Sequence, residues 1–159
     1  MSFERRAVLP LRICLVVLFG VLVVFETLSL PGQWAHMAKE SPDDAHLRWP
    51  LTVVTIFWVV CVQVVVVCTW KLLGMVQADR IFTPSSMRWV DGIVAAIAAA
   101  WTTFLAVFLW VGFNADDPGA PLLMFLLLVC GAVLGLLMVV LRALLRQATT
   151  LRTDMEAVI

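Results

Sequence analysis

Four long apolar runs dominate this sequence of 159 residues and leave few choices of fold. A helix needs about 20 apolar residues to cross a hydrocarbon layer about 30 Å thick. A lone strand cannot satisfy its backbone hydrogen bonds in lipid, so even the valine-rich stretch 64–67 is expected to be helical. We therefore predict an all-α integral membrane protein, a four-helix bundle of two antiparallel transmembrane hairpins. The predicted spans are 8–28, 51–73, 89–113 and 121–145.

Composition agrees with this class of protein. Hydrophobic residues make up 63% of the chain and charged residues 14%, whereas soluble domains have about 45–50% and about 25%. The length suits a single membrane domain, residues 1–159. The segments between and after the spans are two outer loops, an inner loop and an amphipathic tail, at 29–50, 114–120, 74–88 and 146–159 respectively.

The basic residues predict the orientation of the spans. Two of the eleven, Lys39 and Arg48, lie in the predicted outer segments, which also carry several acidic residues. Segments rich in lysine and arginine stay in the cytoplasm, so we expect both termini and the inner loop to be cytoplasmic. The nine residues on that side are Arg5, Arg6, Arg12, Lys71, Arg80, Arg88, Arg142, Arg146 and Arg152.

Small residues indicate where helices approach one another. In lipid, glycine and alanine at four-residue spacing allow close backbone contact. Gly131 and Gly135 have this spacing on the fourth span, and Gly92, Ala96 and Ala100 repeat it on the third. We expect these two faces to meet as a hairpin; a homodimer contact is the alternative.

A few polar side chains lie inside the spans. Gln63 is expected near the bilayer midplane, with Thr102 and Thr103 at a similar depth. Either these groups form interhelical hydrogen bonds or they line a polar pathway. Glu26 follows Arg12 by about 21 Å of helix, so it lies near the outer end of the first span. It is either a protonatable group in an outward-facing cavity or a carboxylate in interfacial water.

The inner loop contains a helix start. Thr83 suits an N-cap and Pro84 the first helical position, with Phe82 and Met87 placed as a hydrophobic staple. The third helix is therefore predicted to begin here. Asp91 is expected to pair with Arg88 or with Lys71.

Helical periodicity continues beyond the fourth span. Leu151 and Met155 fall on one face of the tail and arginines on others, as in an amphipathic helix. Such a tail either lies on the membrane, packs on the inner loop or receives a protein partner. The predicted cytoplasmic contact surface comprises Phe82, Thr83, Pro84, Arg88, Arg142, Arg146, Leu151 and Met155.

No residue pattern indicates catalysis, a cofactor or a metal. His36 and His46 flank acidic residues in the first outer loop, but their spacing fits no ligand set. The four cysteines lie within the spans, where we expect small buried side chains rather than a reactive pair. Phosphate-loop and hydrolase motifs are lacking, and no basic patch suggests nucleic acid as a partner.

Two segments resemble a known family. They are Arg80–Pro84 with Met87–Val90 after the second span, and Leu141–Ala148 with the terminal residues 151–159 after the fourth. Both are similar to bacterial proteins of the domain of unknown function family 2975, which are small four-helix membrane proteins. The resemblance implies a bacterial inner-membrane protein without known catalytic residues. Family members often accompany a small helix-turn-helix regulator, which implies a sensor or regulator by analogy.

Together these observations predict a non-enzymatic membrane protein that acts by protein binding or as a sensor or regulator. The lipid bilayer and either a cytoplasmic protein or further copies of the chain are the expected partners. The alternative is a small oligomeric transporter or channel subunit that uses Glu26 and the polar layer at Gln63. An enzyme of lipid metabolism is a third possibility, since lipid substrates need few polar groups.

Overall fold

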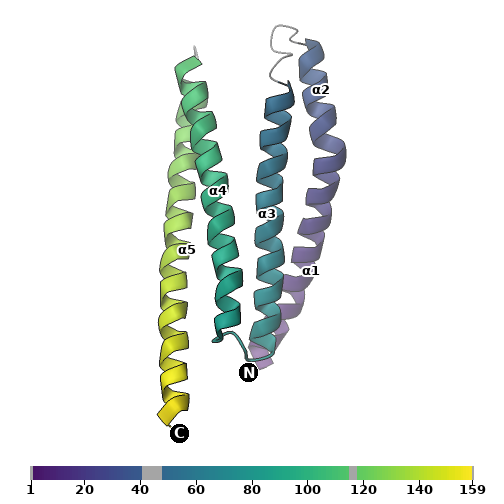
Figure 1. The fold of residues 1–159 in the computed structure, drawn as a ribbon. Coiled ribbons are helices and arrows are strands. Elements are labelled where there is room, and N and C mark those ends of the chain that lie inside the picture. The colour runs from purple at the N-terminus through teal and green to yellow at the C-terminus, as the bar shows by residue number, and fades with distance from the viewer. Residues whose placement is uncertain (1, 41–47, 115–117, 159) are drawn as a thin grey trace. The chain divides into compact units, whose positions relative to one another are not determined.

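The computed structural model describes residues 2–40, 48–114 and 118–158, and every regular element in them is helical (Figure 1). This confirms the all-α prediction. The elements are α1 (Ser2–Val24), the π-helical turn η1 (Phe25–Ser29), α2 (Leu30–Glu40), α3 (Arg48–Gln77), α4 (Pro84–Asn114) and α5 (Gly119–Val158).

Within the described residues, four stretches of helix are long and apolar enough to cross a membrane, as predicted. They are Val8–Gln33, Trp49–Gln77, Pro84–Asn114 and Gly119–Val158, and each contains one predicted span. Many of their large apolar side chains are exposed, among them Leu9, Phe113 and Leu122. Exposed apolar surface on this scale is typical of helices that are solvated by lipid.

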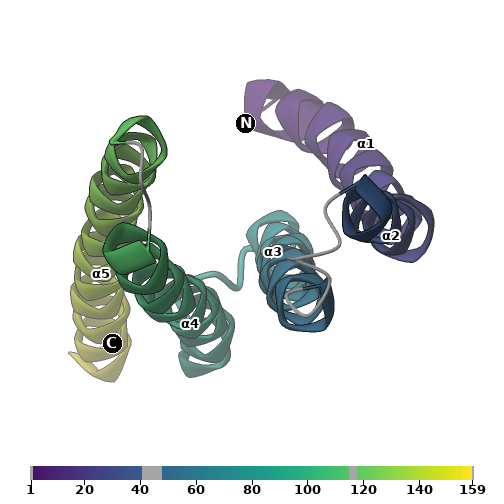
Figure 2. The same cartoon turned by 90° about the horizontal axis from the view of Figure 1, so that it is seen from above.

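The first helical stretch is longer than the sequence suggested. We expected an outer loop from residue 29, but helix continues through η1 and α2 to Glu40. Pro31 accounts for the π turn, because proline has no N–H and its ring would crowd the carbonyl four residues earlier in a regular α-helix. The backbone adapts with a wider turn, in which the Leu30 N–H donates to the Phe25 carbonyl five residues back. Seen from above, α1 and α2 do not share one axis (Figure 2).

By its contacts the chain divides into two units, residues 1–70 and 71–159. In the first unit, η1 contacts both α1 and α2. Leu30, beside the π turn, is 2% exposed, and Val66 and Cys68 are buried on α3. The apolar core of this unit therefore includes Leu30, the residue that follows the π turn.

In the second unit, α4 and α5 lie side by side (Figure 1). Their cross-contacts follow an order in which residue numbers rise along α4 as they fall along α5. These contacts are Asp91 with Arg142, Trp101 with Leu128, and Phe108 with Phe125. The buried side chains of α4, namely Ser86, Val90, Ile93 and Ala96, recur at helical spacing.

A capped turn separates α3 from α4. The Arg80 N–H donates to the Met75 carbonyl and the Asp79 N–H to the Val76 carbonyl, which is the Schellman arrangement. Asp79 takes the left-handed conformation that this cap requires, with φ of 55°. Glycine is the usual residue there because it has no Cβ to clash.

Helix α4 begins at Pro84, the predicted first helical position. The Thr83 hydroxyl donates to the Arg80 carbonyl, and the Ser86 N–H donates to the Thr83 carbonyl. Ser86 is fully buried, and its hydroxyl lies within hydrogen-bonding distance of the carbonyls of Ile81 and Thr83. The hydroxyls of Thr83 and Ser86 therefore help to fix the start of α4, and the Ser85 hydroxyl lies 2.9 Å from that of Thr83.

Candidate functional site

A polar side-chain contact inside the first unit joins two helical segments. The Gln63 side-chain amide on α3 donates a hydrogen bond of 2.9 Å to the Glu26 carboxylate on η1, and both side chains are half-buried. A carboxylate within an apolar helix is costly unless it has such a partner. The pair is thus the clearest candidate for a functional polar group in this unit.

Helical spacing predicts different depths for these two residues, with Gln63 near the bilayer midplane and Glu26 near the outer end of the first span. The structure instead joins their side chains, so the two residues lie at the same level along η1 and α3. Helix continues past Glu26 to Glu40, so Glu26 lies inside a helical stretch and not at its end. It also occupies the π turn, a feature that is frequent at functional sites because it changes side-chain direction.

The two threonines of the predicted polar layer bond within their own helix. The Thr102 hydroxyl donates to the Ala98 carbonyl and the Thr103 hydroxyl to the Ala99 carbonyl, each one turn earlier on α4. Thr102 is exposed and Thr103 half-buried. Both hydroxyl protons are therefore donated within α4 and not to another helix.

The glycines of α5 face large side chains of α4. A Cβ added at Gly131 would lie 3.1 Å from the Trp101 ring, and one at Gly135 would lie 3.5 Å from Ile97. Ala96 is buried, while Gly92 and Ala100 are half-buried. The small residues of α5 thus admit bulky α4 side chains, whereas the four-residue spacing predicts that small residues of the two helices face each other.

Helix α5 also contacts the segment that precedes α4. The Arg152 guanidinium carbon lies 5.7 Å from the centre of the Phe82 ring, a cation–π geometry. Thr149, one turn before Arg152, is 8% exposed. Arg152 was absent from the predicted contact surface, and only its spacing of three residues from Thr149 could have suggested it.

The tail of α5 therefore has two different faces. Thr149, Arg152 and Glu156 form one stripe, in which Arg152 also pairs with Glu156 at 3.4 Å. The opposite stripe is apolar and exposed, and we call it the apolar tail face. It comprises Leu144, Leu151, Met155 and Val158, of which Val158 is 88% exposed.

The remaining members of the predicted contact surface are spread over both helices. Pro84 and Arg88 are exposed at the start of α4, and Arg146 is exposed on α5. Arg142 forms an ion pair with Asp91, which replaces the predicted partners Arg88 and Lys71. The sequence spacing favoured a partner on the same helix, but packing of α4 on α5 brings Arg142 closer.

The histidine, cysteine and acidic side chains of the described residues do not gather into groups of three or more. Within 2–40, 48–114 and 118–158, no group of three or more His, Cys, Asp or Glu side chains could hold a metal. His46 and its acidic neighbours lie outside those ranges. All four cysteines are free thiols, with Cys61 and Cys68 buried. Cys14 and Cys130 are exposed instead of buried as expected, because they lie on outward faces of α1 and α5.

Comparison with known proteins decides the family. The model of the family described as protein of unknown function (DUF2975) matches residues 32–159. The chain belongs to this family. The DUF2975 match covers α3, α4 and α5 in full, together with most of α2. No curated protein and no solved structure matches the chain.

Proposed function

We propose that this DUF2975 protein is a multi-pass protein of the bacterial inner membrane that acts by binding a cytoplasmic protein through the apolar tail face. In this proposal it is not an enzyme, and its termini and inner loop are cytoplasmic. The basic residues on one side of the spans support that orientation. The order of contacts between α4 and α5 supports an antiparallel hairpin, and a second hairpin would complete a four-helix bundle.

The apolar tail face carries the proposal. Its four residues lie on one side of a helix that continues well beyond the length needed to cross a membrane. The other side of the same helix is already occupied, since Arg152 stacks on Phe82 and Thr149 is buried. An apolar helix face held outward in this way suits a hydrophobic groove of a partner. The exposed Gln147, three residues after Leu144 and four before Leu151, borders it with a polar group.

The test is to purify the native complex from its own membrane in mild detergent and to measure its mass and composition. We expect a second polypeptide in fixed ratio, and we expect the double variant Leu151→Glu, Met155→Glu to lose it. Asp154→Asn is the matched control, because Asp154 is exposed on the same tail but outside the apolar face. A partner that remains bound to the double variant would refute the proposal.

Orientation has its own test. A fluorescent protein fused after residue 159 should fold and fluoresce, while alkaline phosphatase fused there should stay inactive, because only the first matures in the cytoplasm. An active phosphatase fusion would overturn the cytoplasmic placement of the tail.

A second candidate function rests on the Glu26–Gln63 hydrogen bond. A paired carboxylate inside a membrane helix is a common element of ion and proton pathways. In this alternative the chain is a small oligomeric transporter or channel subunit. Proton or cation flux into liposomes that is lost in Glu26→Gln and retained in Glu156→Gln would favour it. A homo-oligomer without another polypeptide would point the same way.

A further inference from the structure

One basic side chain of the first unit, that of Arg12, is half-buried. The Nε atom of Arg12 is closed off from solvent and has no hydrogen-bond partner among the residues that the structure describes. The guanidinium carbon lies 5.2 Å from the centre of the Trp70 ring. This cation–π contact covers one face of the guanidinium, but it does not use the N–H groups at its edge.

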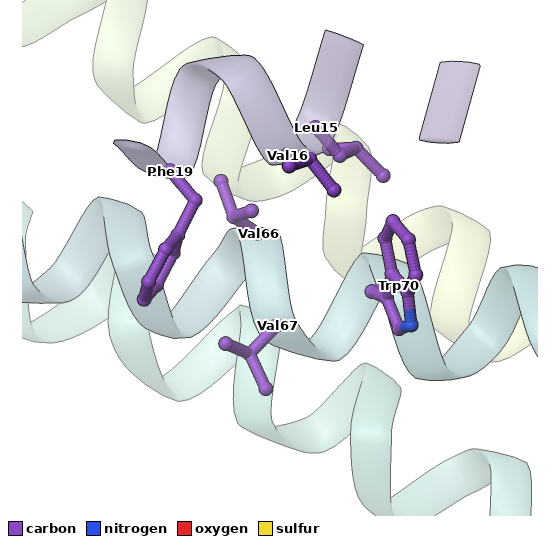
Figure 3. A pocket seen from close by; sticks show the side chains of 6 residues that line it. All are labelled: Leu15, Val16, Phe19, Val66, Val67 and Trp70. Carbon is purple, nitrogen blue, oxygen red and sulfur yellow. The ribbon is translucent and has the colours of Figure 1, made fainter. Parts of the chain in front are cut away.

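A groove begins next to this pair. It is lined by Leu15, Val16 and Phe19 of α1 and by Val66, Val67 and Trp70 of α3, and its volume is about 210 Å³ (Figure 3). Its lining is almost entirely apolar. Figure 3 shows the α1 side chains directed toward α3, with the Trp70 ring at one end.

Helical spacing places Arg12 at the same end of the groove as Trp70. Leu15, Val16 and Phe19 follow Arg12 by three, four and seven residues, which is one face of a helix. The groove thus has a positive charge at one end and apolar side chains along its walls. Those two features match a phospholipid, which has an anionic headgroup joined to an acyl chain.

We propose that Arg12, Trp70 and this groove form a binding site for one anionic phospholipid. The acyl chain lies along the groove, and the headgroup phosphate accepts hydrogen bonds from the Arg12 guanidinium. A guanidinium binds phosphate through paired N–H groups, and its stacking on Trp70 fixes the plane in which they point. Tryptophan suits this depth, because aromatic rings gather where headgroups meet hydrocarbon. The negative charge of the lipid would match the positive charge of the half-buried Arg12.

Both the shape of the groove and the positive charge of Arg12 favour an anionic lipid as the occupant. Basic pockets between membrane helices on the cytoplasmic side bind anionic headgroups, and Arg12 is among the nine basic residues of that side. An apolar helix from elsewhere would fill the groove but would offer no acceptor to the N–H groups of the Arg12 guanidinium. The site is independent of the apolar tail face, so either proposal can fail alone.

The test is native mass spectrometry of the full chain in mild detergent with added phosphatidylglycerol or phosphatidylcholine. We expect one phosphatidylglycerol to be retained preferentially, and we expect Arg12→Gln to weaken its binding about tenfold through loss of charged hydrogen bonds. Arg88→Gln, which removes an exposed arginine elsewhere, should leave retention unchanged.

A second variant tests the groove itself. Val16→Phe fills it while keeping Arg12, and we expect it to reduce retention as well; it also serves if Arg12→Gln fails to fold. Equal retention of the two lipids by the natural chain, unchanged retention in Val16→Phe, or an equal loss in Arg88→Gln would each overturn the proposal.

Discussion

The indole Nε1 of Trp101 on α4 donates a hydrogen bond of 2.9 Å to the backbone carbonyl of Leu128 on α5. The ring reaches this carbonyl because it passes over Gly131, less than one turn further along α5. A residue with any side chain at that position would compete with the ring for space. The contact therefore joins one large and one small residue across the two helices.

Gly131→Val should destabilise the α4–α5 pair. The new side chain would begin 3.1 Å from the Trp101 ring, and crowding of this kind costs about 1–3 kcal/mol. The measurement is unfolding in mixed detergent and SDS, followed by circular dichroism. Gly112→Ala is the control, because a Cβ there meets no atom within 4 Å and should be neutral or slightly stabilising. Equal losses from both variants would contradict the packing described.

Loss of the Gln63 amide should leave the Glu26 carboxylate without its donor. We expect Gln63→Leu to lower stability by about 0.6 kcal/mol, a typical value for one hydrogen bond between membrane helices. Glu26→Gln should lose less, because a glutamine oxygen can still accept from Gln63. Thermal unfolding of the purified protein in detergent compares the two. The reverse ranking would argue against the pair.

The ion pair between Asp91 and Arg142 should respond to charge exchange. Asp91→Arg alone places two arginines together and should lower thermal stability, whereas the double variant Asp91→Arg, Arg142→Asp should restore most of it. Both side chains are over 40% exposed, so the effects should be small and should shrink with added salt. Additive losses in the double variant would show that the two residues do not interact.

Asp79→Gly should stabilise the turn between α3 and α4. Asp79 has a φ of 55°, a conformation that costs residues with a Cβ about 1 kcal/mol or more and costs glycine little. Asp79→Ala keeps the Cβ but loses the local hydrogen-bonding ability of aspartate, so it should be less stable than the natural chain. Chemical unfolding curves of the three proteins provide the comparison.

The positions of the helices could be predicted from the sequence, but the side-chain contacts between them could not. The apolar runs and Pro84 predicted the spans and the start of α4, because lipid allows few other backbones. The extension past residue 28 was missed because Pro31 and Gly32 normally end a helix, while here a π turn accommodates the proline. The contacts of Arg142 with Asp91 and of Arg152 with Phe82 depend on how α5 packs against α4 and the segment before it. The periodicity of a single helix carries no information about such packing.

Helix α5 has 40 residues without interruption, which corresponds to a length of about 60 Å. That is about twice the hydrocarbon thickness, so a helix that begins at one membrane surface projects about 30 Å past the other. Because the helix is uninterrupted, a change of tilt inside the membrane also moves its projecting end. A change of about 10° in its tilt would displace the Val158 end by about 5 Å without any hinge. Whatever alters the packing of α5 inside the bilayer would thereby move the apolar tail face relative to the membrane surface.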